Sequence, residues 1–305
     1  MSDVARRESM RGPIAVSLCV MAVWGASPTL VRIANEAIDP LLVGLYRTIL
    51  GGIVALPVML VMRQRLPVGA HERRLLGVSS LSGFVVFPLL FGLGQQRTSA
   101  LHGGMILAAL PIITGTYAAI LSRRRPANVW LLGGGVALAG EVAIVALRAG
   151  AGSGRPTLAG DLLIALSALV VSAGYIAGAR LAAAGYPSIA TTFWGVIVGA
   201  LACLPILAIV LLTHPTERWH AASWGAVTFL AIPTTLVAYI GWYWALARGG
   251  IARISTIQFF QPFSGIVLAS LLLGERVTLP LVVAGAGILV GVAIAQRPAA
   301  RGARP

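Results

Sequence analysis

The feature that most constrains this chain is a series of apolar runs, each about 20 residues long, with hardly a charged side chain inside them. A helix of about 20 residues rises about 30 Å, the thickness of the hydrocarbon core of a bilayer. Charged residues make up only 10% of the chain, whereas water-soluble domains usually carry about 25%. The sequence therefore predicts an all-α polytopic membrane protein.

Hydropathy windows of about 19 residues predict ten transmembrane helices. The expected spans are 13–34, 40–62, 75–97, 100–122, 127–148, 159–182, 188–212, 222–246, 252–273 and 279–296. The basic lead and apolar stretch at the start of the chain are similar to a signal peptide. Because that apolar stretch continues to Ile33 and contains Trp24 and Pro28, we expect an uncleaved first helix instead.

Arginine supplies all 23 basic residues, since the chain has no lysine. Most of these arginines fall in loops on the side of the N-terminus, so the positive-inside rule predicts two cytoplasmic termini. The missing lysine and the abundant alanine and glycine are typical of a GC-rich bacterial genome, which indicates a bacterial inner membrane. No soluble basic domain holds the charge, so nucleic acid is not an expected partner. A Walker-type nucleotide motif requires lysine, so neither ATP nor another cofactor is expected.

The two halves of the sequence match each other, which indicates a tandem duplication. Pro111 matches Pro262 at an offset of 151, and Arg32 matches Arg180 at an offset of 148. Five spans per copy is an odd number, so the copies enter the membrane from opposite faces as inverted repeats. The expected organisation is a cytoplasmic tail over 1–12, five-helix repeats over 13–150 and 151–296, and a cytoplasmic tail over 297–305.

Inversion also accounts for a change of sign between the copies. Arg123, Arg124 and Arg125 follow the fourth span, whereas Glu275 occupies the position equivalent to Arg124 after the ninth. Positive charge is favoured on the cytoplasmic side of the membrane. We therefore expect Arg124 in the cytoplasm and Glu275 outside.

Three stretches, "WGASPTLVRIA", "YRTILGGIVALP" and "QPFSGIVLASLLLGERVT", are similar to the EamA-like family of the drug/metabolite transporter superfamily. The resemblance spans essentially the whole chain. It implies a central cavity among eight helices, peripheral fifth and tenth helices, and export of small metabolites or amino acids. One departure is Arg124, because the family often has an acidic residue in that hairpin.

Polar and aromatic side chains at helical spacing on apolar spans indicate a substrate path. The candidate substrate-binding residues are Trp24, Ser27, Arg47, Phe91, Gln95, Ser172, Tyr175, Tyr239, Trp242, Gln258 and Gln261. Alternative interpretations remain open for each type. Aromatic side chains are common in interfacial belts, which is the favoured interpretation for Tyr243 and Trp244. A glutamine in a span can also bond a neighbouring helix.

Arg47 and Glu141 are the ionisable residues expected well inside spans, at similar depth below the outer surface. Because an isolated charge is costly there, they are candidates for a structural ion pair or a proton site. The peripheral place of the fifth helix in the family argues against the pair. The family often has an arginine early in its second helix, so the resemblance carries a role to Arg47 more readily than to Glu141.

The sequence thus predicts a secondary transporter that exports a small metabolite, amino acid or amphipathic drug by alternating access. The alternatives are a receptor or structural membrane protein, and an intramembrane enzyme. The four histidines lie in loops or near span ends, and no His/Asp/Glu cluster shares a helix face, so neither a metal site nor an enzyme is expected. The expected partners are a small-molecule substrate and membrane lipid. The Gly287-xxx-Gly291 spacing also suggests a homodimer.

Overall fold

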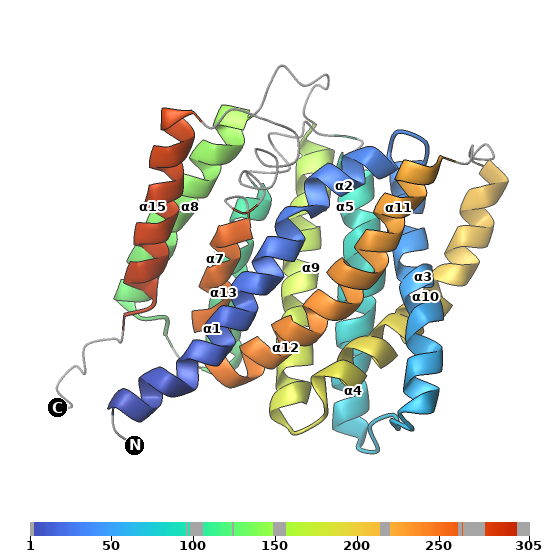
Figure 1. The fold of residues 1–305 in the computed structure, drawn as a ribbon, viewed down its shortest axis with the longest axis horizontal. Helices are drawn as coiled ribbons and strands as arrows, with labels where there is room; N and C mark the ends of the chain where they lie inside the picture. Colours follow the sequence, from blue (N-terminus) through green and yellow to red (C-terminus); the bar gives the residue numbers. More distant parts are fainter. Residues whose placement is uncertain are drawn as a thin grey trace.

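The computed structural model describes residues 3–95, 97, 106–123, 125–148, 157–213, 220–261, 264 and 278–297. Every secondary-structure element in this part of the chain is helical, so the all-α prediction is confirmed for it (Figure 1). The α-helices are α1 (Asp3–Gly25), α2 (Ser27–Ala34), α3 (Pro40–Val61), α4 (Ala70–Ser80), α5 (Phe87–Gln95), α7 (Leu110–Leu121), α8 (Asn128–Arg148), α9 (Leu158–Ala183), α10 (Ser188–Thr213), α11 (Ala221–Phe229), α12 (Ala238–Gly249), α13 (Ile251–Ser255) and α15 (Leu279–Ala295). The other elements are the π-helices η1 (Leu81–Val86) and η2 (Leu230–Val237) and the 3₁₀-helix η3 (Thr256–Phe259).

Within the described residues, 5 helical stretches are long and apolar enough to cross a membrane, by length and composition. They are Pro40–Val61, Ala70–Gly94, Leu158–Ala183, Ser188–Leu212 and Ala221–Gly249. Shorter apolar helices cover Met10–Gly25, Leu110–Leu121, Asn128–Ala143 and Val282–Ala295. Parts of the expected fourth and ninth spans lie outside the described residues, so the ten-span arrangement stays a prediction.

The first expected span, 13–34, differs from the structure. It is divided at Ala26 into α1 and α2, and α1 begins at Asp3, so most of the expected tail 1–12 is helical. Pro28 lies at the start of α2, where its missing N–H breaks no helical hydrogen bond. The hydropathy pattern could not locate this break because both helices are apolar.

The two π-helices interrupt otherwise α-helical spans. In each, the residue after the segment donates its N–H five residues back: Phe87 to the Ser82 carbonyl and Ala238 to the Pro233 carbonyl. At the offset of 151, η1 corresponds to residues 232–237, which lie within η2. π-Bulges are rare and are frequent at functional sites. Equivalent positions in the two halves therefore share an unusual local geometry.

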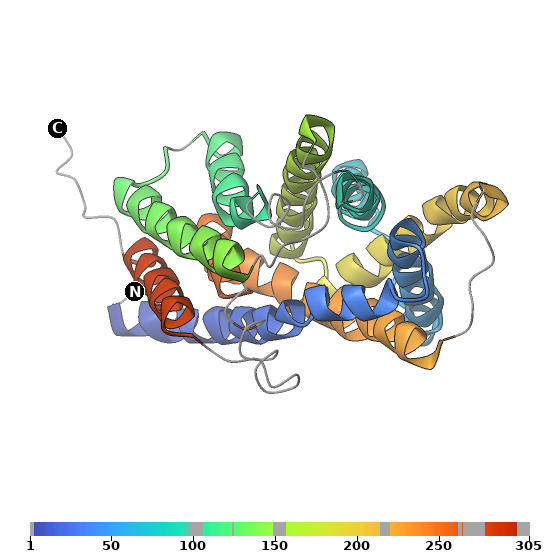
Figure 2. The same ribbon diagram turned by 90° about the horizontal axis from the view of Figure 1, so that it is seen from above.

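Helices from the two halves pack against each other in pairs: α3 against α10, α8 against α15, α1 against α12, and α4 and α5 against α9. The α8–α15 pair lies at one end of the molecule, and α3, α10 and α11 lie at the other (Figures 1 and 2). Gly133 and Gly291 bring α8 and α15 into backbone contact. Gly287 and Gly291 thus face α8 of the same chain, so this spacing is already used in an intramolecular contact.

The start of α1, the end of α15 and the α3–α4 and α9–α10 connections lie at the same end of the molecule (Figure 1). These are segments that the arginine distribution assigns to the cytoplasm. The side of the membrane on which they lie stays a prediction. Arg124 and Glu275 both lie outside the described residues, and single-cysteine labelling at those positions tests it.

Candidate functional site

Thr235, Tyr239 and Trp242 form a stripe at helical spacing that begins in η2 and continues into α12, and Tyr239 and Trp242 are among the predicted substrate-binding residues. Its three side chains are buried, with exposed fractions of 1%, 3% and 0%. The hydroxyl of Thr235 donates to the Leu230 carbonyl at 2.8 Å, a bond that reaches five residues back along η2. The stripe therefore points into the molecule rather than toward lipid.

Four of the predicted residues from three different helices form one group, which we call the aromatic cluster: Trp24, Tyr175, Tyr239 and Trp242. The Trp24 ring lies 6.0 Å from Tyr175, 5.3 Å from Tyr239 and 5.5 Å from Trp242, centroid to centroid. Tyr175 lies 5.9 Å from Tyr239 and 5.8 Å from Trp242. These spacings fit the range for interacting aromatic pairs. The cluster thus joins α1, α9 and α12.

Two more aromatic residues extend this group. Phe84 of η1 lies 4.8 Å from Tyr239, and Tyr243 lies 5.6 Å from Tyr239. Tyr243 is fully buried, and its hydroxyl is 2.8 Å from the Ser79 hydroxyl. The interfacial interpretation of Tyr243 is therefore wrong. Its position four residues after Tyr239, on the same helix face, was the signal that could have placed it.

Arg47 of α3 contacts η2, the π-helix that precedes Tyr239 and Trp242. Its Nε donates to the Thr235 hydroxyl at 2.6 Å, and the side chain is half-buried. Nearby, the Trp24 Nε1 donates to the Thr234 carbonyl at 3.0 Å. The guanidinium and the aromatic rings are therefore held beside the same π-helix.

Several buried polar atoms of the predicted site residues and of η2 have no hydrogen-bond partner in the structure. They are both amide atoms of Gln258, the Nε1 of Trp242 and the Oγ1 of Thr234. Gln258 is 3% exposed and Trp242 is 0% exposed. An unpartnered buried polar group costs about 1–3 kcal/mol, so such groups require an explanation. A polar ligand would satisfy them.

The remaining predicted substrate-binding residues are not part of the aromatic cluster. The Gln261 Nε2 lies 3.5 Å from the Trp24 carbonyl, a long contact. Ser172 is buried and bonded to the Thr114 hydroxyl at 2.9 Å. Phe91 stacks on Phe87 at 5.8 Å, apart from the aromatic cluster, and Ser27 is half-buried at the start of α2. Gln95 ends α5, and its side chain lies outside the described part.

Arg47 and Glu141 do not form the ion pair that their depth suggested. Glu141 lies on α8, which packs chiefly against α15, whereas α3 packs against α10 at the opposite end of the molecule (Figures 1 and 2). Glu141 is 9% exposed, and its Oε2 has no partner in the structure. Depth along a span sets one coordinate only, and the lateral distance between helices decides the pairing.

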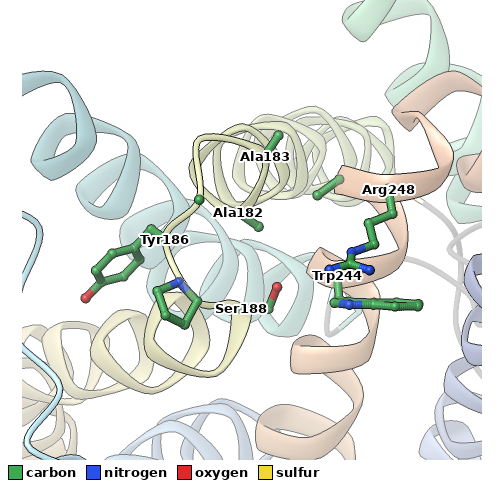
Figure 3. A pocket seen from close by; sticks show the side chains of 9 residues that line it. Ala182, Ala183, Tyr186, Ser188, Trp244 and Arg248 are labelled. Carbon is green, nitrogen blue, oxygen red and sulfur yellow. The ribbon is translucent and has the colours of Figure 1, made fainter.

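A pocket of about 400 Å³ lies near the aromatic cluster, between the end of α9, the α9–α10 connection and the end of α12. Arg248 and Trp244 form one wall, and residues 182–188 form the other (Figure 3). The Tyr186 hydroxyl donates to the Arg65 carbonyl at 2.7 Å, and burial raises the pKa of this phenol to about 12. The sequence interpretation missed this pocket because residues of three separate segments line it.

Membrane-length helices around a buried aromatic and polar centre are typical of transport proteins. The model of the EamA-like transporter family matches residues 11–146 and residues 158–296. The chain belongs to this family, as the sequence resemblance implied.

The relatives agree with this assignment. The uncharacterized transporter YdeK of Bacillus subtilis is 31% identical over 90% of this chain and 93% of its own length. A protein of Streptantibioticus cattleyicolor named "Probable terminal-alkyne amino-acid exporter" is 23% identical over 75% of this chain and 74% of its own. A solved crystal structure aligns with a TM-score of 0.74 at 22% identity, over 93% of this chain and 96% of that one, which shows the fold alone. The protein is therefore a transporter-family membrane protein.

Proposed function

We propose that the protein is a secondary transporter that moves a small organic solute by alternating access, with the solute bound at the aromatic cluster. The observation that carries the proposal is the convergence of Trp24, Tyr175, Tyr239 and Trp242 from three helices. The unpartnered indole N–H of Trp242 supplies hydrogen-bonding capacity within the cluster, and Gln258 of η3, which packs against α1, adds two unpartnered amide atoms. Rings and unsatisfied polar atoms together suit a solute with an apolar body and polar ends.

The mechanism rests on inverted five-helix copies. The α1–α12 contact has its counterpart in the packing of α9 against α5, and the α2–α11 contact has its counterpart in the packing of α9 against α4. The α3–α10 and α8–α15 pairs each join equivalent helices. The family model matches two segments of similar length, and η1 and η2 occupy equivalent positions. All three observations support a pseudo-two-fold relation. Such a relation allows the two copies to rock about a central site and open it to each face in turn.

The solute class follows from the chemistry of the site and from one relative. The guanidinium of Arg47 favours a solute with an anionic or strongly accepting group, and the rings favour an apolar or aromatic body. The Streptantibioticus cattleyicolor relative is named as an amino-acid exporter. Export of an amino acid or a related metabolite is therefore our first choice, ahead of amphipathic drugs.

Flux through proteoliposomes tests the proposal. Purified protein, shown to be folded after reconstitution, is loaded on one side with radiolabelled amino acids and small carboxylates, with and without a pH gradient. We expect flux of at least one solute, and its loss in Trp242→Ala. The receptor alternative predicts ligand binding without flux, which would overturn the proposal. The described residues contain no group of three His, Cys, Asp or Glu side chains that could hold a metal ion.

A further inference from the structure

The pocket between α9 and α12 lies on the same two helices as the aromatic cluster. Ala182 lines the pocket seven residues after Tyr175 on α9, and Arg248 lines it six residues after Trp242 on α12. At 1.5 Å per residue, both pocket residues lie about 10 Å from the cluster along the helix axes. The pocket therefore lies beyond the cluster along the same two helices, toward the end of the molecule where α1 begins (Figure 1).

Tyr243 lies between the pocket and the cluster. A Cβ added at Gly178 would lie 2.4 Å from the Tyr243 ring, so the ring rests directly on the α9 backbone there. Gly178 falls between Tyr175 and Ala182 on that helix. The phenol is fixed by its 2.8 Å contact with the Ser79 hydroxyl. Tyr243 therefore packs on the stretch of α9 and α12 that separates the pocket residues from the cluster.

The charge of the pocket comes from Arg248. Its guanidinium carbon lies 5.0 Å from the centroid of the Trp244 ring, a cation–π contact that orients the group against the pocket wall. No acidic residue lines the pocket, and among the described residues none accepts a hydrogen bond from this guanidinium or pairs with it. The Ser188 hydroxyl on the opposite wall adds a neutral donor. Both groups suit an anionic oxygen.

The repeat places a second arginine at the other end of the molecule. At the offset of 151, Arg248 corresponds to Arg97, which follows α5. α5 and α12 run in opposite directions, so the end of α5 and the end of α12 lie at opposite ends of the molecule (Figure 1). Arg97 and Arg248 thus occupy equivalent positions in the two copies.

We propose that this pocket is the mouth of the transport path at the end where α1 begins, and that Arg248 on Trp244 recognises a carboxylate of the solute before it passes Tyr243. This inference rests on the proposed function and adds a second, peripheral binding step for a small organic anion. An anionic lipid headgroup would present similar charge to the arginine. Continuity with the aromatic cluster favours the solute.

Thiol protection tests the inference without requiring transport. Ala183 lines the pocket and is exposed, so Ala183→Cys is introduced into the full chain with Cys19→Ser and Cys203→Ser. The rate of reaction with neutral N-ethylmaleimide is measured in phosphatidylcholine vesicles. The probes are phenylacetate and phenethylamine, which share a ring and differ in the sign of their charge. We expect phenylacetate to slow labelling and phenethylamine to leave it unchanged.

Charge variants identify the residue responsible. Arg248→Gln should raise the phenylacetate concentration for half-protection about fivefold, the size expected for an exposed charge pair. Arg248→Lys should keep it within about twofold, because the charge remains. Arg180→Gln removes an exposed positive charge that does not line the pocket and should change nothing.

Three results would overturn the inference. They are equal protection by the two probes, protection unchanged in Arg248→Gln, and protection by vesicles containing phosphatidylglycerol with none by phenylacetate. The last result would assign the pocket to lipid. If phenylacetate still protects the thiol but the protein moves no solute in proteoliposomes, the proposed transport function is wrong while the anion site in the pocket is retained.

Discussion

The aromatic cluster and the α8–α15 pair both join helices of the two halves of the chain, yet they are built in opposite ways. The cluster joins helices through large rings 5.3–6.0 Å apart, with buried polar atoms left unpartnered beside them. The α8–α15 pair joins helices through glycines, with backbone atoms in direct contact. Packing through glycine leaves no volume for a ligand between the two backbones. We infer that the pair is a scaffold and that the cluster binds the solute.

The largest expected effect is on the scaffold. A Cβ at Gly291 would lie 2.3 Å from the Ala137 nitrogen, whereas a Cβ at Gly287, one turn earlier, meets its nearest atom at 3.9 Å. Gly291→Ala should therefore lower stability by about 1–3 kcal/mol, as overpacking typically does. Gly287→Ala should cost less than about 0.5 kcal/mol. Thermal unfolding of the purified variants measures both, and equal melting temperatures would show that α8 and α15 do not pack this closely.

The second prediction compares the same change, glutamine to leucine, in two separate variants, one expected to affect solute binding and the other helix packing. Gln258 has two unpartnered amide atoms, so Gln258→Leu should preserve stability and reduce flux about tenfold, the value of one lost hydrogen bond. Gln296 accepts from the Arg253 Nε at 2.6 Å and donates to the Thr256 hydroxyl at 2.9 Å. Gln296→Leu should lower the melting temperature and spare flux. The distinction between cluster and scaffold fails if the two variants behave alike.

The aromatic cluster could be predicted because helical periodicity needs no knowledge of neighbouring helices. Tyr239 and Trp242 share a face in any α-helix, and a polar or aromatic face in a membrane span turns inward. The π-helices could not be predicted, since "LAIPTTLV" is as apolar as an α-helical span. Within η2, the Thr235 hydroxyl donates to the carbonyl five residues back and accepts from the Arg47 Nε.

The sequence also could not predict which helices lie side by side in the bundle. Equal depth suggested a pair between Arg47 and Glu141, but their helices pack against different partners. Trp244 and Arg248 lie near a helix end and could be interpreted as belt and orientation residues. Their position in a pocket depends on the α9–α10 connection, which folds back beside them (Figure 3). Contacts between separate segments of this kind produce no periodic pattern in the amino-acid sequence, so a single sequence does not reveal them.

A third prediction concerns the two tryptophans of the cluster. Trp24 donates its N–H to the Thr234 carbonyl, whereas the N–H of Trp242 has no partner in the structure. Trp24→Phe should cost about 1 kcal/mol of stability, a typical net hydrogen bond. Trp242→Phe should leave stability nearly unchanged and weaken solute binding about fivefold. Melting temperature and half-saturation concentration are measured for each, and a larger stability loss at Trp242 would indicate that its N–H bonds within the protein.

The smallest effect on transport is expected at Glu141. α8 packs chiefly against α15, so Glu141 lies on a different helix pair from the residues of the aromatic cluster. Glu141→Gln is nearly isosteric and removes the option of a buried charge, which costs several kcal/mol without a partner. We therefore expect equal or higher thermal stability and flux within about twofold of the parent protein. The measurement is solute flux with and without an imposed pH gradient. If Glu141→Gln abolishes the gradient-driven part of the flux while the folded yield is unchanged, Glu141 is the proton-coupling residue, and the α8–α15 pair takes part in transport rather than serving as a scaffold alone.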